Sequence, residues 1–197
     1  MTTISKNDFG TDYIELWQAL AKESDVVLPR RQSLTMNHVP DYLSAMVIQE
    51  FTGDQLRVKL TGTLIDDFYR MNIGETDFLN FYSGDTKQYF IELLKMMATE
   101  PYGVFVEREY TYGFGKTINS YALSLPFADR HGNFRYLISV TNGNEFMSKI
   151  DVRLDDSAGQ IGVLKDMKLI DLGFGTPSEE KMKSLLENVI VENLHKL

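Results

Sequence analysis

The sequence predicts an α+β domain built around one antiparallel sheet. Two strand-like segments, 43–51 and 55–62, come first, and three more follow a helical region, at 103–112, 116–126 and 133–142. The turns between neighbouring strands are short and rich in Gly, Asp and Asn, as in antiparallel hairpins. The chain order is therefore two strands, a block of helices and a three-strand meander.

Apolar residues spaced three and four positions apart predict the helices. Residues 11–23, 63–74 and 83–99 show this pattern, with Thr11 as the expected N-cap of the first helix and Gly74 ending the second. The positions expected to face inward are Tyr13, Leu16, Trp17 and Leu20 in the first helix, and Tyr89, Phe90, Leu93, Leu94 and Met97 in the third.

The pattern after residue 143 is weaker. Residues 151–175 are mixed and are expected to hold a short helix and extended pieces. Thr176 to Glu179 resemble a capping box with proline at the first helical position, and an amphipathic helix should follow. Its apolar face either joins a second copy, giving a homodimer through the terminal helices, or packs on its own domain. We expect the homodimer, and the face comprises Met182, Leu185, Leu186, Val189, Ile190 and Leu194.

The sequence GFGKT at 113–117 resembles the end of a phosphate-binding loop. That motif needs a glycine at position 110, where Tyr110 stands, and it must open a helix. Residues rich in β-branched and aromatic side chains flank the segment on both sides. A β-hairpin is therefore the better interpretation of this segment.

The overall composition excludes several functional classes. The chain has 197 residues, with 20 Lys and Arg against 28 Asp and Glu, a net charge of −8 that disfavours nucleic-acid binding. It has no cysteine, which excludes disulfides, thiolate metal sites and cysteine nucleophiles. No apolar run is long enough to span a membrane, and the N-terminus lacks a signal-peptide core. We expect a cytoplasmic protein with no membrane or nucleic-acid partner.

Four motifs of the chain are LPRRQSLTMNHVPDYLSAMVIQEF, LRVKLTGT with Gly62 and Thr63, Gly74, and LSLPF in the fourth strand. Together they resemble the motifs of a PAS-like domain family that is common in alphaproteobacteria. The resemblance covers residues 27–142, between an N-terminal helix and lead-in at 1–26 and a C-terminal extension at 143–197. It implies a five-stranded antiparallel sheet with helices on one face, acting as a bacterial sensor or regulatory module. A departure is Arg70, since the family often has another glycine in this helical block.

The cofactor of such a domain stays unknown at this stage. A flavin–cysteine adduct is excluded by the absence of cysteine. Haem needs an axial ligand, and His38, His131 and His195 are poorly placed for one, while residues 83–99 contain no histidine. No two histidines lie close enough in the sequence to predict a metal site.

Arg108 is the residue that most suggests a binding site. It alternates in phase with Val106 and Tyr110, which should face the core, whereas Glu107 and Glu109 should mark the wet face. A buried arginine needs an anionic partner. That partner is either a bound carboxylate or phosphate ligand or an internal acidic side chain, unless the face assignment is reversed.

Three residues on the neighbouring strands are expected to share this pocket with Arg108 and Tyr110. They are Asn119, Tyr121 and Tyr136, although tyrosines at strand period are also common in cores. The leading hypothesis is a sensory domain that binds a small ligand or a signalling protein partner. A dimerisation scaffold with a filled core is the main alternative. The sequence shows no nucleophile with a neighbouring base in a recognisable arrangement, so an enzyme is the less favoured interpretation.

Overall fold

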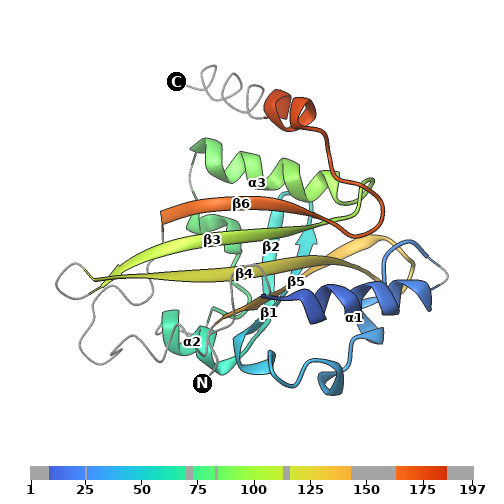
Figure 1. Ribbon diagram of the computed structural model, residues 1–197, viewed down its shortest axis with the longest axis horizontal. Helices are drawn as coiled ribbons and strands as arrows, with labels where there is room; N and C mark the ends of the chain where they lie inside the picture. The colour runs from blue at the N-terminus through green and yellow to red at the C-terminus, as the bar shows by residue number, and fades with distance from the viewer. Residues whose placement is uncertain are drawn as a thin grey trace.

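The computed structural model describes residues 9–24, 26–69, 73–82, 84–112, 116–142 and 163–185. These residues form a six-stranded antiparallel sheet with helices on both faces (Figure 1). The strands are β1 Met46–Thr52, β2 Gln55–Thr61, β3 Tyr102–Tyr112, β4 Lys116–Ala128, β5 Phe134–Thr141 and β6 Val163–Asp171. The helices are α1 Thr11–Lys22, α2 Thr63–Tyr69 and α3 Gly84–Met96, with short 3-10 helices η1 Arg31–Ser33, η2 Met36–His38, η3 Leu43–Ala45 and η4 Phe78–Phe81.

The sheet order is β2-β1-β5-β4-β3-β6. Its first five strands confirm the predicted strand segments, but the prediction of five strands was incomplete. The sixth strand, β6, pairs with β3 from Tyr102 opposite Asp171 to Glu109 opposite Val163. Because β6 is an edge strand and only partly covered, its apolar residues do not alternate cleanly, which is why its segment looked mixed.

The hairpin between β3 and β4 is confirmed by the strand pairing on either side of it. Tyr112 lies opposite Lys116, and the register continues without a shift to Val104 opposite Ser124. Residues 113–115 lie outside the described part of the chain. Lys116 and Thr117 belong to a strand and open no helix, so the conditions for a phosphate-binding loop are not met.

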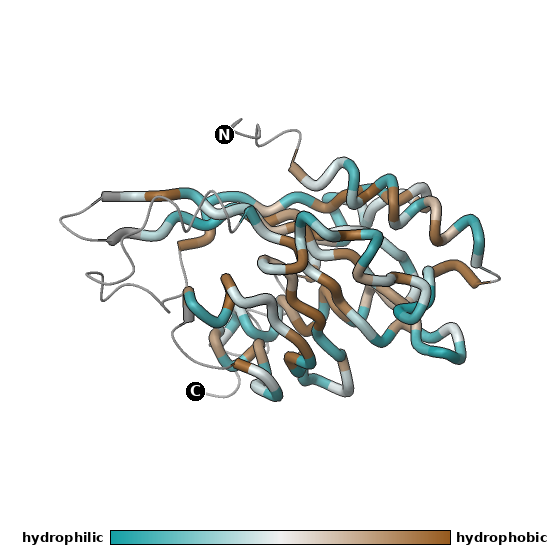
Figure 2. The backbone as a smooth tube through the Cα atoms, turned by 90° about the horizontal axis from the view of Figure 1, so that it is seen from below, coloured by the Kyte–Doolittle hydropathy of each residue, from teal (hydrophilic) through white to brown (hydrophobic). Residues whose placement is uncertain are grey.

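One face of the sheet is covered by α1. The Tyr13 hydroxyl donates to the Ile138 carbonyl at 3.2 Å, and the Trp17 indole N–H donates to the Pro126 carbonyl at 2.7 Å. In Figure 2, α1 lies on one side of the sheet, and α2 and α3 lie on the opposite side. The inward face predicted for α1 is therefore buried on its own sheet. Its N-cap is Gly10, at φ 79°, rather than Thr11.

The opposite face carries α2, η4 and α3. The apolar side of α3 packs against β3 and β5, and the Tyr102 hydroxyl donates to the Leu93 carbonyl at 2.7 Å. Burial raises the pKa of the Tyr102 phenol, so this hydrogen-bond donor keeps its proton at neutral pH. The helices between β2 and β3 therefore cover one face of the sheet, as the resemblance implied. The helix α1 adds a layer on the other face.

Gly62 explains part of the Gly-Thr motif at the end of β2. A Cβ atom at this position would lie 2.3 Å from the carbonyl oxygens of both Leu43 and Ser44. Only glycine allows the backbone of β2 to approach the segment that leads into β1 this closely. The next residue, Thr63, begins α2.

The C-terminal helix begins close to its predicted position. Residues 179–185 are helical, and Ser178 Oγ accepts from the Lys181 N–H at 3.2 Å, so Ser178 is the N-cap rather than Thr176. Met182 and Leu185 are half-buried against the cluster that contains α3, and Lys181 pairs with Glu100. The other members of the predicted apolar face, Leu186, Val189, Ile190 and Leu194, lie outside the described residues.

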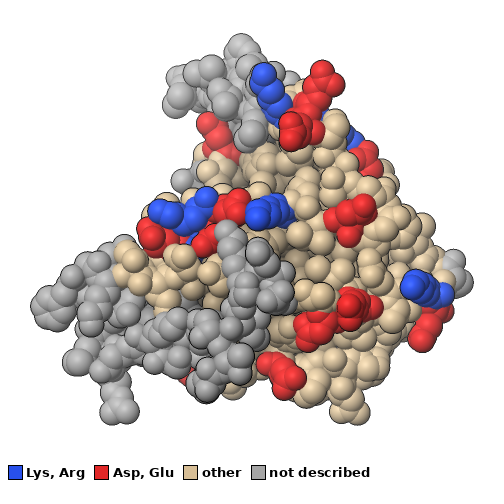
Figure 3. Space-filling model, in the orientation of Figure 1, with Lys and Arg blue, Asp and Glu red and all other residues tan. Residues whose placement is uncertain are grey.

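The surface of β6 carries charges of both signs. Lys165 Nζ lies 3.0 Å from Glu109 Oε1 on β3, and Lys168 Nζ lies 3.6 Å from Asp166 Oδ2. Figure 3 shows Lys and Arg side chains interspersed with Asp and Glu on this face of the molecule. Interspersed charges of this kind discourage pairing of an edge strand with other chains. None of the helices in the described ranges is long and apolar enough to cross a membrane.

Candidate functional site

A cavity of about 130 Å³ lies between the sheet and the helices α2, η4 and α3. A dry cavity of about 150 Å³ is known to accept benzene, so this space is of the size that holds a single small ring. The sheet contributes Val47, Gln49, Leu56, Val104, Val106, Arg108, Tyr110, Ser120, Ala122, Ser124, Leu137, Ser139 and Thr141. The helices and the residues next to them contribute Leu64, Ile65, Phe68, Phe78, Leu79, Tyr82, Phe90, Leu93, Leu94 and Met97.

Most polar side chains on the cavity floor already have a partner within the protein. The Thr141 hydroxyl donates to the Ala45 carbonyl at 3.3 Å, and the Ser120 hydroxyl donates to Asn142 Oδ1 at 3.4 Å. The hydroxyl groups of Ser124 and Ser139 form a hydrogen bond with each other, with their oxygens 2.7 Å apart. That contact uses one hydroxyl proton, and the second proton of the pair meets no acceptor among the described residues.

Gln49 differs from these residues. Only 3% of this residue is exposed, yet no hydrogen bond joins its side-chain amide to another described residue. In the described part of the chain, every fully buried side-chain nitrogen or oxygen has a hydrogen-bond partner. The Gln49 amide must therefore reach open space, and the open space beside it is the cavity that it lines.

Arg108 and Tyr110 also line the cavity, as the sequence predicted, so the reversed face assignment is wrong. Arg108 Nη2 donates to the Tyr82 hydroxyl at 2.5 Å. The Tyr110 ring meets the Phe68 ring edge-on, with centroids 5.1 Å apart. Arg108 thus has an internal partner in the Tyr82 phenol.

The other three predicted site residues lie on the opposite face of the sheet. Asn119 Nδ2 donates to Glu107 Oε1 at 2.9 Å, and the Tyr121 ring stacks on Phe105 at 6.0 Å. Tyr136 packs against the core beneath α1. The expectation that Asn119, Tyr121 and Tyr136 share the pocket of Arg108 was therefore wrong.

The error was one of register. Arg108 lies opposite Ser120, so Asn119 and Tyr121 on either side of Ser120 point to the other face. A hairpin centred on residue 114 implies this pairing, and the sequence could have revealed it. Glu107 was also expected on a wet face, but it is only 8% exposed.

Sequence reasoning missed Gln49. It stands in phase with Val47 and Phe51 on β1, and a polar residue in an apolar phase is the signal that could have identified it. Its lack of a partner could not be read from the sequence, because it depends on which residues from other segments of the chain surround the side chain.

Neither histidine in the described part of the chain lines the cavity. His38 lies in η2 and His131 lies in the turn between β4 and β5, and both are exposed. His195 lies outside the described residues. Among the residues that the structure describes, no group of three or more His, Asp or Glu could hold a metal ion.

Comparison with known proteins gives the family. A family model described as PAS domain matches residues 6–140, which is more than half of the chain. The chain belongs to the PAS domain family. PAS domains are generally sensory and signalling domains. The match includes α1 and ends before β6, so the family segment begins earlier than the resemblance at 27–142 suggested.

The solved structures similar to this PAS domain include the PAS domain from Bordetella pertussis BvgS. The two chains are 16% identical, with a TM-score of 0.40, and the similarity covers 56% of this chain and 87% of that one. A comparison with curated proteins found no match.

Proposed function

We propose that this chain is a sensory PAS domain that binds a small molecule in the cavity between its sheet and helices. The observation that carries the proposal is Gln49, whose buried amide has no partner among the described residues. Leaving such a group unpaired costs roughly 1–3 kcal/mol. A bound molecule that pairs with the amide would recover this cost and be held in one orientation.

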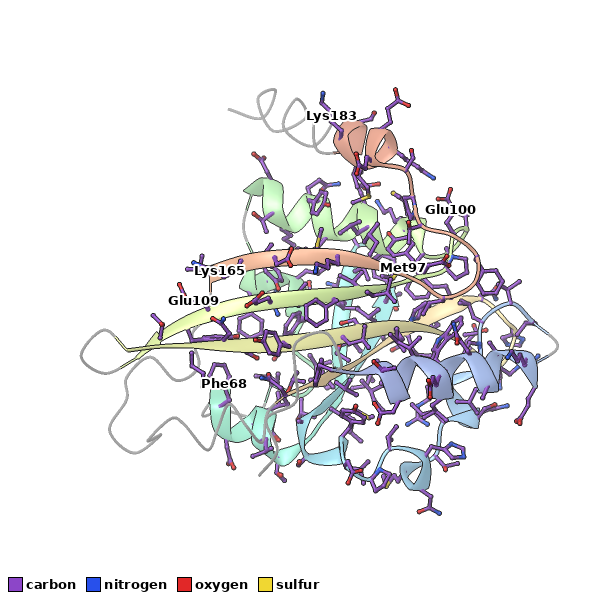
Figure 4. All side chains as sticks on the ribbon, in the orientation of Figure 1. Phe68, Met97, Glu100, Glu109, Lys165 and Lys183 are labelled. Atoms are coloured by element: carbon purple, nitrogen blue, oxygen red, sulfur yellow. The ribbon has the colours of Figure 1, made fainter. Side chains whose placement is uncertain are left out.

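The signal would pass through α3 to the C-terminal segment. Leu93, Leu94 and Met97 line the cavity, and they belong to the same apolar cluster that Met182 and Leu185 join. Lys181 also pairs with Glu100, and Glu100 lies just beyond α3 (Figure 4). A ligand that displaces α3 would therefore change the position of the C-terminal helix. A signalling partner that binds this helix would respond to the change.

Blocking the cavity should abolish ligand binding without unfolding the domain. Ala122 lies on the cavity floor, so Ala122→Phe should fill the space that a ligand needs. We expect a screen of metabolites by thermal denaturation, together with native mass spectrometry, to identify molecules that bind the unmodified chain. Their effect should disappear in Ala122→Phe.

The matched control is Ala98→Phe, because Ala98 is exposed and does not line the cavity. This variant should respond to the same molecules as the unmodified chain. Hits that stabilise Ala122→Phe as strongly as the unmodified chain would place binding elsewhere. A screen without hits, and no copurifying ligand, would favour a protein-interaction scaffold instead.

We further propose that the domain forms a homodimer through its C-terminal helix. Met182 and Leu185 are only half-buried by their own domain, which leaves part of this apolar face open to a partner. Light scattering at micromolar concentration should show a dimer for the full chain and a monomer for a chain that ends at Gly175. A monomeric full chain would contradict the proposal, and so would a dimer of the shortened chain, since the contact would then lie elsewhere.

A further inference from the structure

The two polar ends of the cavity lie far apart. Strands β5 and β4 separate Gln49 on β1 from Arg108 on β3, and three strand spacings amount to about 14 Å. Along the strands, Gln49 is level with Leu137 and Pro126, whereas Arg108 is level with Ser120, six residues along β4 or about 20 Å away. A molecule of single-ring size cannot touch both ends.

The helices mark the same two ends. Phe68 of α2 meets Tyr110, near Arg108, while Met97 beyond α3 belongs to the cluster of Leu56 and Leu137, near Gln49. Figure 4 labels Phe68 and Met97, which stand well apart along the sheet. At the first end Arg108 already donates to Tyr82. At the second end the Gln49 amide has no partner among the described residues.

Gln49 has a polar neighbour on the next strand. Val47 lies opposite Ser139 and Gln49 lies opposite Leu137, so Ser139 is diagonal to Gln49 on the same face. The Ser124–Ser139 pair retains one hydroxyl proton without an acceptor among the described residues. This end therefore offers an amide N–H and an O–H as donors and the amide oxygen as an acceptor.

The charge of the lining limits the ligand further. Arg108 is the one cationic side chain among the described residues that line the cavity, and it lies at the other end. An anion beside Gln49 would be buried without a counter-ion, which is costly. The remaining walls at this end, including Leu56, Leu93 and Leu137, are apolar.

We infer that the ligand is a compact, uncharged ring whose edge carries a hydrogen-bond donor beside an acceptor, as in a lactam. This inference rests on the proposed function, because it assigns the chemistry of the same cavity. The planar amide of Gln49 presents an acceptor beside a donor, so it can form two parallel hydrogen bonds with such an edge. The apolar walls then enclose the rest of the ring.

Thermal denaturation with four probes at millimolar concentration tests the inference. They are 2-pyridone, which has the lactam edge, N-methyl-2-pyridone, which lacks its donor, benzene, which has neither group, and benzoate, which is anionic. We expect 2-pyridone to raise Tm most. The N-methyl compound and benzene should give smaller shifts, and benzoate should give none.

Gln49→Leu separates a ligand-binding glutamine from a structural one. Without ligand its Tm should be unchanged or higher, because the substitution removes an unpaired buried amide. Its affinity for 2-pyridone should fall about tenfold, whereas the benzene shift should persist. The matched control is Gln55→Leu, the same substitution at an exposed position of β2, which should leave the 2-pyridone response intact.

Arg108→Met tests the other end of the cavity. It should lower Tm through loss of the hydrogen bond to Tyr82 and keep the preference for 2-pyridone. A larger shift with benzoate that Arg108→Met removes would overturn the inference in favour of an anionic ligand. A marked drop in the Tm of ligand-free Gln49→Leu would also overturn it, because the amide would then be structural.

The probes also separate failure of this inference from failure of the proposed function. If benzene and 2-pyridone shift Tm equally in the unmodified chain, the cavity binds small molecules but the amide does not select them, as expected if ordered water serves Gln49. If no probe and no metabolite shifts Tm, the cavity is not a binding site and the proposed function fails as well.

Discussion

Trp17→Ala is expected to lower the free energy of unfolding by about 3–5 kcal/mol, the usual cost of removing a large buried aromatic side chain. Trp17 is fully buried, and its indole N–H donates to the Pro126 carbonyl at 2.7 Å. The substitution leaves a large void beneath α1 and a buried carbonyl without this donor. Urea denaturation followed by circular dichroism measures the effect.

Two further substitutions separate the contributions of Trp17. Trp17→Phe keeps most of the apolar volume and removes the hydrogen bond, so it should cost less than the alanine change. Leu16→Ala, one residue earlier on the half-buried side of α1, should cost less still. If Trp17→Ala proves no more destabilising than Leu16→Ala, α1 does not cover the sheet as described.

Removing β6 is expected to have the second large effect. A chain that ends at Asn142 loses the strand that pairs with β3, together with Leu172, which is 3% exposed. Met167, Leu169 and Ile170 also lose their partial burial. Apolar burial alone accounts for roughly 3 kcal/mol or more, since each fully buried side chain of this size contributes about 1.5–3 kcal/mol.

The shortened chain also exposes the edge of β3, a long strand next to the cavity. We expect a lower Tm and concentration-dependent aggregation, which light scattering during heating would detect. A chain that ends at Gly175 keeps β6 and removes only the last helix, so it serves as the control. If the chain ending at Asn142 stays monomeric and as stable as this control, β6 is dispensable, and the domain is complete where the family match ends.

These two predictions concern different elements of the domain. Trp17 secures α1 on one face, whereas β6 protects the edge of the strand that carries Arg108 and Tyr110. Trp17 is not among the residues that line the cavity. A destabilised Trp17 variant should therefore still show the ligand preference of the unmodified chain at temperatures where it remains folded.

The sequence by itself determined where the first five strands lie along the chain and which faces of the helices point inward. Hydrophobic period and turn residues are local properties, so Tyr13, Trp17, Leu93 and Leu94 were placed correctly from spacing alone. The phase of Arg108 with Val106 and Tyr110 followed from the same alternation. The PAS-like resemblance also rested on local motifs, including Gly62, whose close backbone contacts the structure explains.

Tertiary structure alone decided which of these segments meet. The sixth strand has a weak pattern because one of its edges is open, so only its pairing with β3 reveals it. Asn119, Tyr121 and Tyr136 were assigned to the wrong face because a shift of one residue in register reverses every side chain of a strand. Gln49 became a candidate site residue only when neighbours distant in sequence were seen to leave its amide unpaired, because satisfaction of a buried polar group depends on the whole fold.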